Sequence, residues 1–174
     1  HRTLPTLRAA IVWLVPALLS GGCASVDRPA PPTSYLLEFD PAAMPEVPGN
    51  GGILHVGRPE ALAGADTRGI AYRREPHQLR YYTKSQWADP PAQMLQTALT
   101  SALEASGMFK AVVNDGRVPA DYLLTTQLLR LEQNLAADGN GTTDIRLRLQ
   151  LIAVPEHSLL GSRVIDASAA NPSR

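Results

Sequence analysis

The sequence predicts an α+β domain in which a mostly antiparallel sheet carries one long amphipathic helix on one face. Residues 143–154 alternate between apolar and polar side chains, which is the pattern of a strand with one buried face and one wet face. Residues 94–103 instead place apolar side chains at spacings of one, three and four, as in a helix with one apolar stripe. Strand-like segments precede and follow this helix, so its apolar stripe is expected to lie against a sheet.

The charge of the chain argues against nucleic acid as its main partner. The 174 residues include 16 Lys and Arg and 16 Asp and Glu. The first 22 residues contain Arg2 and Arg8 and no acid, so without them 14 basic residues face 16 acidic ones, a net charge of −2 with histidine neutral. Phosphate binding draws on clustered basic residues, and this balance provides no such excess. The length suits one globular domain with appended segments.

Residues 1–22 have the layout of a signal peptide. Arg2 and Arg8 precede an apolar run from Ala9 to Leu19, and small residues follow the run. The run is interrupted by Pro16 and, at eleven residues, is too short to span a hydrocarbon core of ~30 Å. A buried helix of the domain is the alternative interpretation of this run.

Cys23 is the only cysteine, so the chain can form no internal disulfide. It follows two glycines after the apolar run, a position that resembles a bacterial lipobox, in which the cysteine is acylated and becomes the new N-terminus. An unmodified cysteine beside an ordinary signal-peptide cleavage site is the alternative. The residue directly after the cysteine, Ala24, is not an aspartate. In this it resembles enterobacterial lipoproteins that are destined for the outer membrane. Residues 23–34 are rich in proline and are predicted to tether the domain to the membrane.

Short strands are predicted ahead of the helix at residues 35–39, 53–56, 70–73 and 79–83. In the first of these, Tyr35, Leu37 and Phe39 share one face. The last two are separated only by a short loop that contains Pro76, so we expect them to form a β-hairpin. Residues 59–66 fit either one turn of helix or a loop.

The helix is predicted to begin around Pro90 and to end at Gly107. Asp89 is expected to cap its first turn with the side-chain carboxylate, and Pro90 and Pro91 occupy positions where an N–H would lack a partner in any case. Gly107 accepts the left-handed conformation that commonly ends a helix. The apolar stripe consists of Met94, Leu95, Ala98, Leu99, Ala102 and Leu103.

Further strands are predicted after the helix at residues 109–113, 122–132, 143–154 and 161–167. The sequence Asp-Gly-Asn-Gly at residues 138–141 is typical of a hairpin turn and joins the second and third of them. Arg146 and Arg148 fall on the wet face of the third, where they are either solvated or in contact with acidic headgroups or an acidic partner.

The sequence contains no pattern that indicates catalysis. The four histidines are too far apart for helical or hairpin spacing, and neither a nucleophile elbow nor a phosphate-binding glycine loop is present. We therefore predict no catalytic residue, no cofactor and no metal site. An envelope hydrolase is the least favoured alternative, because it would require a polar cluster within a pocket.

An aromatic and basic cluster lies just before the helix. Arg73, Arg80, Tyr82 and Trp87 are candidate partner-binding residues, because arginine and aromatic side chains are enriched at the centres of interfaces. In the alternative interpretation, Tyr81 and Trp87 pack beneath the helix and the arginines form a solvated face.

Several segments, taken in order, carry a resemblance over about residues 18–165. After the lipobox they are Tyr35-Leu36-Leu37, Ile70-Ala71-Tyr72-Arg73, Leu79-Arg80-Tyr81-Tyr82, Trp87-Ala88-Asp89-Pro90-Pro91 with Met94-Leu95, residues 106–113, and Ala120-Asp121-Tyr122-Leu123-Leu124. This series resembles the ABC-type transport auxiliary lipoprotein family, of which the PqiC-like proteins are the best-known branch.

The resemblance implies a lipid-anchored domain at the outer membrane that faces the periplasm and has no catalytic role. Its partners would be an MCE/MlaD-type protein and the associated ABC permease and ATPase of a lipid transport system. Only Cys23, as the lipid attachment site, has a role by position. Family members usually continue into a C-terminal amphipathic helix, so residues 35–174 are expected to form a single domain without that helix.

The oligomeric state stays open, and a homo-oligomer is compatible with the sequence. The alternative function is a periplasmic lipoprotein that binds a lipid or another small ligand in an apolar cavity between helix and sheet.

Overall fold

The computed structural model describes residues 30–49, 51–62, 64–137 and 140–171. The predicted signal peptide at residues 1–22 and the predicted lipid attachment site Cys23 lie outside these residues, as does most of the predicted tether. The described residues from Pro31 onward belong to one compact unit, the domain described below.

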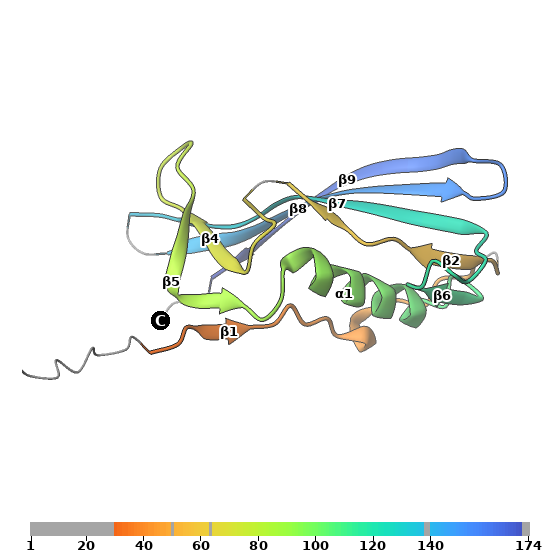
Figure 1. Cartoon of the computed structure of the whole chain (residues 1–174), viewed down its shortest axis with the longest axis horizontal. Coiled ribbons are helices and arrows are strands. Elements are labelled where there is room, and N and C mark those ends of the chain that lie inside the picture. Colours follow the sequence, from red (N-terminus) through yellow and green to blue (C-terminus); the bar gives the residue numbers. More distant parts are fainter. Residues whose placement is uncertain (1–29, 50, 63, 138–139, 172–174) are drawn as a thin grey trace, which may run out of the picture. The chain divides into compact units, whose positions relative to one another are not determined.

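The described part of this domain contains one α-helix, one short 3₁₀ helix and nine strands. In chain order they are β1 (Thr33–Tyr35), η2 (Pro41–Ala43), β2 (Ile53–Val56), β3 (Glu60–Ala61), β4 (Gly69–Arg73), β5 (Arg80–Trp87), α1 (Pro91–Ala105), β6 (Ala111–Val113), β7 (Tyr122–Leu135), β8 (Gly141–Ala153) and β9 (Ser158–Ala170) (Figure 1). Among the described residues, no helix is long and apolar enough to cross a membrane.

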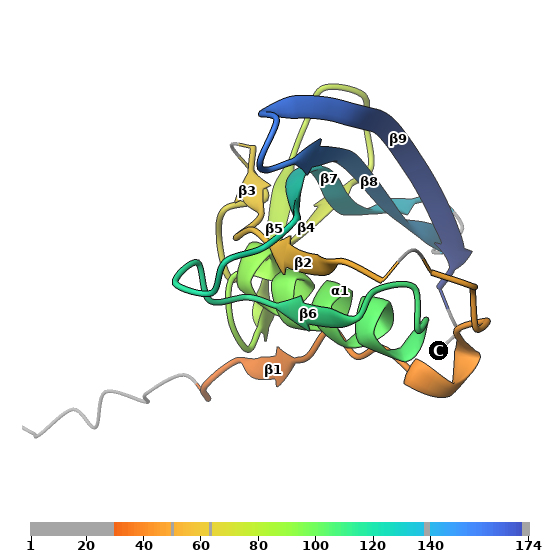
Figure 2. The same ribbon diagram turned by 90° about the vertical axis from the view of Figure 1, so that its right-hand side faces the viewer.

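The long strand β7 is the centre of the sheet. One of its edges pairs antiparallel with β8 from Tyr122 to Leu135, and β9 continues the sheet beyond β8. Because β8 occupies that whole edge, the opposite edge of β7 pairs with β2, β3 and β4, which follow one another along it. β6 pairs with β2, β5 with β4, and β1 with β5 (Figure 2).

The sheet is mixed, so the prediction of a mostly antiparallel sheet is confirmed for its long ladders, while several short pairings are parallel. Five of the eight strand pairings are parallel and three are antiparallel. Each parallel pairing joins only two or three residues per strand, too few to leave a periodic pattern in the sequence. The two longest ladders, β7–β8 and β8–β9, are antiparallel and are the ones that the alternation predicted. The described residues form one α-helix packed on a nine-stranded sheet, an arrangement consistent with the α+β class.

α1 has 15 residues and begins one position later than the capping prediction requires. Its N-cap is Pro90, and the Asp89 carboxylate makes no capping hydrogen bond, so that detail of the prediction is wrong. Instead, the Pro90 carbonyl accepts hydrogen bonds from the backbone N–H groups of Gln93 and Met94, at 2.9 and 3.3 Å. The predicted end is confirmed, because Gly107 has a φ of 67°.

Two apolar clusters join α1 to the sheet. The first contains buried Ala65, Leu95, Leu128, Leu131 and Leu147, and the second contains buried Leu54, Val56 and Leu124, with Leu99 and Leu103 of the helix packed against it. The predicted alternation of β8 is confirmed at its centre, where Leu147 is buried between exposed Arg146 and Arg148. Leu95, Leu99 and Leu103 of the predicted stripe therefore face the sheet, as the sequence predicts.

The N-terminal segment differs from its prediction. β1 ends at Tyr35, so residues 36–39 do not continue as a strand, and Thr33 and Ser34 of the predicted tether already pair with β5. The chain then runs along α1 instead. The N–H of Ala88 donates to the Tyr35 carbonyl at 2.7 Å near the start of the helix, and the N–H of Val47 donates to the Ser106 carbonyl at 2.9 Å near its end. Figures 1 and 2 show this segment beside α1.

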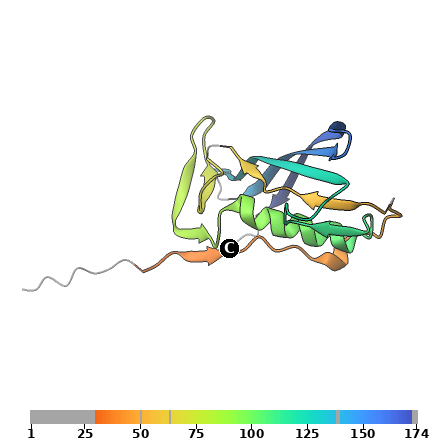
Figure 3. The ribbon, with the colours of Figure 1, turned by 45° about the vertical axis from the view of Figure 1, so that its right-hand side comes forward.

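The remaining loops and strands refine the predictions. Among residues 59–62 and 64–66, which the structure describes, there is the two-residue strand β3 and no helix. The predicted strand at residues 161–167 is present and longer, as β9. The β7–β8 turn lies partly outside the described residues, since positions 138 and 139 are among those not described. Figure 3 shows the hairpin of β8 and β9 extending beyond the part of the sheet that α1 covers.

Candidate functional site

The four predicted partner-binding residues lie on the β4–β5 hairpin, which is called the β4–β5 corner below. Trp87 is at the end of β5 that leads into α1, whereas Arg73, Arg80 and Tyr82 lie toward the hairpin loop. β4 and β5 pair antiparallel, which confirms the predicted hairpin, and β4 also pairs with the end of β7 through Tyr72 and Arg73. The structure gives the four side chains different environments.

Trp87 is held mainly by the core. Its side chain is half-buried and packs against the cluster that contains Leu95 and Leu128. The guanidinium Nε of Arg68 donates to the Trp87 carbonyl at 3.1 Å, and the N–H of Trp87 donates to the Arg68 carbonyl at 2.7 Å. These contacts favour the interpretation of Trp87 as a packing residue at the corner.

Tyr81 does not pack beneath the helix, which corrects that part of the alternative interpretation. Its side chain is 40% exposed, and its hydroxyl donates to the carbonyl of Gly64 at 3.0 Å. Successive side chains of a strand point to opposite faces, so Tyr81 and Tyr82 leave β5 on different sides.

Tyr82 and Arg73 are bound to β7. The Tyr82 hydroxyl donates to Oε1 of Gln133 at 2.8 Å, and its ring lies 4.6 Å from that of Tyr72, measured between centroids. The Arg73 guanidinium donates to Oε2 of Glu132 at 3.0 Å, and the Glu132 side chain is only 7% exposed. Arg73 therefore neutralises a buried carboxylate, a structural role that sequence patterns do not reveal.

Arg80 is the candidate whose charge faces solvent. Its residue is exposed, and its guanidinium donates to Oε1 of Gln78 at 3.2 Å, a neutral partner in the same hairpin. Arg73 is held in an ion pair with Glu132, whereas Arg80 can offer its guanidinium to a partner without breaking such a pair.

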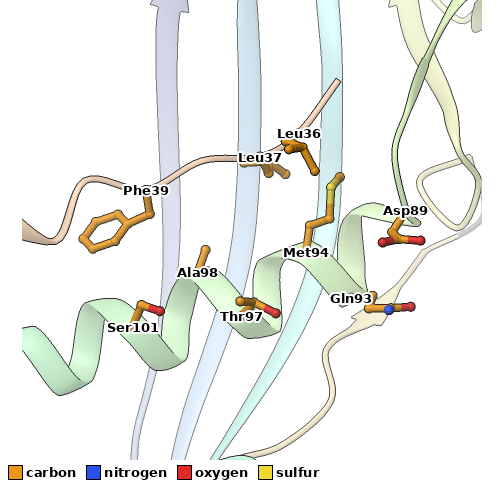
Figure 4. Close-up of a pocket in the computed structure, with 9 residues that line it drawn as sticks. All are labelled: Leu36, Leu37, Phe39, Asp89, Gln93, Met94, Thr97, Ala98 and Ser101. Atoms are coloured by element: carbon orange, nitrogen blue, oxygen red, sulfur yellow. The ribbon is translucent and has the colours of Figure 1, made fainter. Parts of the chain in front are cut away.

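A groove that the sequence did not predict lies between the N-terminal segment and α1 (Figure 4). Its volume is about 320 Å³. The apolar lining is Leu36, Leu37, Phe39, Met94 and Ala98, and the polar lining is Asp89, Gln93, Thr97 and Ser101. In Figure 4, Met94 and Ala98 point from the helix toward the N-terminal segment. The groove exists because residues 36–39 run beside the helix rather than within the sheet.

One sequence signal could have indicated this groove. Gln93, Thr97 and Ser101 recur at a spacing of four, so they share one side of α1 at the margin of the predicted apolar stripe. The apolar run that contains Leu36 and Phe39 requires a surface outside the sheet to pack against. The assignment of this run as a strand hid that requirement.

A polar row crosses the outer strands of the sheet. Asp166 of β9 lies 3.6 Å from a guanidinium nitrogen of Arg130 and 3.4 Å from one of Arg146. Arg148 donates to Oε1 of Gln127 at 3.0 Å. The predicted solvated arginines of β8 are thus exposed but have partners on neighbouring strands.

Asp144, in the same region, accepts a hydrogen bond from the Ser168 hydroxyl of β9 at 2.7 Å. This bond, together with bonds from Thr142 and Asn134 and the nearby charge of Arg130, lowers the pKa of the Asp144 carboxyl.

The histidines within the described residues are dispersed. His55 lies on β2, whereas His77 and His157 occupy turns in which each has a positive φ, of 65° and 52°. Within the described ranges, no three His, Cys, Asp or Glu side chains are arranged to hold a metal ion.

One protein-family model matches most of the chain. Residues 35–173 match the family model described as ABC-type transport auxiliary lipoprotein component. No curated protein sequence matches the chain significantly.

Solved structures show the same fold. Protein XCC0632 from Xanthomonas campestris, assigned to the family DUF330, is 26% identical with a TM-score of 0.66, over 82% of this chain and 78% of that chain. A crystal structure of an uncharacterized protein is 16% identical with a TM-score of 0.60, over 83% and 84% of the two chains. The PelC dodecamer from Paraburkholderia phytofirmans is 13% identical over 73% and 78% of the two chains and is less similar in structure, with a TM-score of 0.43.

Proposed function

The chain belongs to the family of ABC-type transport auxiliary lipoprotein components, and from this premise we propose that it is a non-catalytic accessory subunit of an MCE-type lipid transport system. Its partners would be an MCE/MlaD-type periplasmic protein and, through it, an ABC permease and ATPase. Lipid on Cys23 would anchor it to the outer membrane, with the domain facing the periplasm. The family match over residues 35–173 is the observation that carries this proposal.

The β4–β5 corner is the proposed docking surface. β1, the first strand of the domain, pairs with β5, and Tyr35 lies opposite Trp87 in that pairing. The chain therefore enters the domain beside Trp87 at one end of β5, and Arg80 lies at the other end of the same strand. A partner bound along β5 would lie on the same edge of the sheet as β1.

The contacts at the corner divide the four candidates into two groups. Arg80 would contact the partner directly through its exposed guanidinium. Arg73, Tyr82 and Trp87 would fix the shape of the corner, because their side chains are already bound to Glu132, to Gln133 and to the core.

Co-purification of the full-length chain with the MCE/MlaD-type protein tests this surface. We expect Arg80→Glu to reduce the recovered partner at least about tenfold, because a charge reversal at the centre of an interface typically costs more than 1.4 kcal/mol. Arg58→Glu, at an exposed arginine between β2 and β3, is the matched control and should leave recovery unchanged. Equal recovery with both variants would show that the corner is not the docking surface.

Arg73 requires a different experiment, because Arg73→Glu alone would place a second negative charge beside Glu132. The double variant Arg73→Glu with Glu132→Arg keeps an ion pair and changes only its direction. If Arg73 acts through the fold, the double variant should retain partner binding, whereas loss of binding in a folded protein would indicate direct contact.

The anchor can be tested independently. Mass spectrometry of the membrane fraction should find the mature chain beginning at Cys23 with attached acyl chains, and Cys23→Ser should release the protein from the outer membrane. A soluble product with an unmodified cysteine would disprove the anchor without affecting the docking proposal.

The groove favours a second candidate function, the binding of a lipid or another small apolar ligand. Its volume of about 320 Å³ is at the lower end of the range for small-molecule sites, and most of its larger side chains are apolar. The described residues that line it include no histidine, cysteine or lysine, so it gives no support to a hydrolase.

A native mass spectrum of the purified chain tests the groove. A co-purified lipid that is lost in Ala98→Trp and kept in Ala137→Trp would support binding in the groove. Ala98 lines the groove, whereas Ala137 is an exposed residue of the turn after β7. A lipid that co-purifies with both variants would be bound outside the groove.

A further inference from the structure

The two walls of the groove beside α1 carry negative charge and no positive charge. One wall belongs to residues 35–49 and the other to residues 89–105, which contain α1, and together they include five acids and no Lys, Arg or His. The acids are Glu38, Asp40, Glu46, Asp89 and Glu104. The rest of the chain after residue 22 has 14 basic and 11 acidic residues. The negative charge is therefore local to the groove and does not reflect the composition of the whole chain.

Within the described residues, none of these five carboxylates belongs to an ion pair. The ion pairs found there lie on β4, β7, β8 and β9 and in the loop after β6. The Asp40 carboxylate accepts the backbone N–H of Ala42 at 2.9 Å, which leaves its charge in place. Asp89 is exposed and is the one charged residue among the nine described residues that line the groove. An apolar groove edged by charges of a single sign concentrates ions of the opposite sign, here cations.

The groove is long and narrow. Gln93, Thr97 and Ser101 line it at successive spacings of four, so the lined part of α1 is about 12 Å long at about 1.5 Å per residue. Spread over that length, a volume of about 320 Å³ corresponds to a cross-section of about 27 Å², or a width of about 5–6 Å. A helix with its side chains is about 10–12 Å wide. The groove therefore fits one extended alkyl chain and is too narrow for a helix of another protein.

The charge lies at one end of this groove. In Figure 4, Asp89 and Gln93 lie at one end of the lining. Phe39 and Ser101 lie at the other end, and Met94 lies between the two ends. Apart from Asp89, the described lining is uncharged. This arrangement suits a molecule with a charged head and an apolar tail.

We propose that the groove binds an amphiphile with a single alkyl chain and an ammonium head group. The chain lies along Met94 and Ala98, and the ammonium lies beside Asp89. An apolar cavity of about 150 Å³ holds the six carbons of benzene, so about 320 Å³ has room for a chain of about twelve carbons. The proposal rests on the second candidate function above, the binding of an apolar ligand in the groove, and adds the charge of the head group.

The same chemistry can come from two sources. One is a simple alkyl amine, and the other is a phospholipid with one acyl chain and an ethanolamine head group. An anionic amphiphile is disfavoured, since its head group would meet Asp89 and the other carboxylates of the two walls. The charge of the head group therefore separates this proposal from nonspecific apolar binding.

Photolabelling of the full chain in isolated cell envelopes tests the charge of the head group. The probes are dodecylamine and dodecanoic acid, each with a diazirine on the alkyl chain, so that they differ only in the head group. Labelled peptides are identified by mass spectrometry, and the labelling of residues 36–39 and α1 is divided by the labelling of the whole chain. We expect this groove fraction to be at least about threefold higher for the amine, because the walls of the groove attract cations and repel anions.

Three variants make the result specific. Asp89→Asn removes the charge with almost no change in size and should lower the groove fraction of the amine about 1.5- to 5-fold, the range expected for one exposed charge pair. Asp66→Asn, at an exposed aspartate outside the groove, is the matched control and should leave that fraction unchanged. Ala98→Trp should remove labelling of the groove by both probes, because Ala98 lines it.

Equal groove fractions for the two probes, or an unchanged fraction for the amine in Asp89→Asn, would overturn the proposal but leave apolar binding in the groove as a candidate function. Absence of groove labelling by either probe would overturn both. Neither result bears on the docking of a transport partner, which Arg80→Glu tests separately.

Competition with unlabelled amphiphiles identifies the source of the ammonium. Lysophosphatidylethanolamine that competes more strongly than dodecylamine would assign the site to a phospholipid, whereas weaker competition would assign it to a simple amine. Loss of the co-purified MCE/MlaD-type protein in Asp89→Asn, without amine labelling of the wild type, would overturn the proposal and show that the groove is a protein contact.

Discussion

The β4–β5 corner and the β8–β9 hairpin use similar residues in opposite ways. At the corner, Trp87 packs against the core, Tyr82 is bound to Gln133, and Arg73 is paired with buried Glu132. In β9 every residue is exposed, including two leucines, a valine and an isoleucine. By composition the corner thus resembles a binding site, yet most of its candidate side chains are occupied by internal contacts. β9 lacks a comparable cluster of aromatic and basic residues, yet its side chains are exposed.

The difference shows that composition is a weak guide to a free surface. Arginine and aromatic residues are enriched at interfaces, but they also satisfy buried polar groups within a fold. An edge strand is recognised from its pairing, which depends on the whole topology of the sheet. Four predictions test this comparison of an internally bound region with an open one.

The largest effect is expected from truncation of a leucine on the covered strands. Leu128 of β7 is 1% exposed, so Leu128→Ala should lower the free energy of unfolding by about 2–5 kcal/mol through lost burial and a cavity. Leu160→Ala in β9 should change it by less than about 0.5 kcal/mol, because Leu160 is 53% exposed. Urea unfolding of both variants measures this contrast, and similar values for the two would contradict it.

The ion pair at the corner should have the next largest effect. Arg73→Ala leaves Glu132 buried without its partner and should cost about 2–3 kcal/mol, somewhat less than a fully buried pair because Arg73 is 34% exposed. Replacement of both residues, as Arg73→Met with Glu132→Leu, should recover most of this loss. Unfolding of Arg73→Met, Glu132→Leu and the double variant forms the cycle that measures the coupling, and a double variant no more stable than Arg73→Met would refute it.

Two glycines have room for an added Cβ, so their replacement by alanine compares the effect of backbone conformation without a steric clash. A Cβ added at Gly107 or at Gly161 would meet no atom within 4 Å. Gly107, after α1, has a φ of 67°, so Gly107→Ala should cost about 1 kcal/mol. Gly161 in β9 has no such positive φ, and Gly161→Ala should be neutral or slightly stabilising. Thermal unfolding measures both, and equal effects would show that the left-handed conformation is not the cause.

The smallest effect concerns pH and the bond between β8 and β9. The pKa of Asp144 is held below its ordinary value of 3.8, chiefly by the hydrogen bond from Ser168. A lowered folded pKa stabilises the protein above the ordinary value, and this stability is lost as the pH falls through the folded pKa. Ser168→Ala should therefore lower the melting temperature slightly at neutral pH and show a weaker fall below about pH 4 than the wild type. Ser162→Ala, on the same strand, is the control, and a wild-type profile in Ser168→Ala would disprove the assignment.

Sequence reasoning succeeded where one element carries its own pattern. The hairpin of β4 and β5, the helix with its end at Gly107, and the alternation around Leu147 were all predicted from local periodicity and turn residues. It failed where two patterns compete. Residues 35–39 alternate as a strand would, yet Leu37 packs against the core while the segment runs beside α1. Asp89 has the right chemistry for a cap but lies one position too early.

The sequence by itself determined the α+β class, the positions of the long elements and the family resemblance, because these depend on period and on local conformational preference. Only the tertiary structure decided strand direction, the groove beside α1, the pairing of Arg73 with Glu132 and the open edge of β9. Each of these joins segments far apart in the chain, so no local pattern contains it. The physical reason is that burial and pairing belong to contacts between elements, whereas periodicity belongs to one element alone.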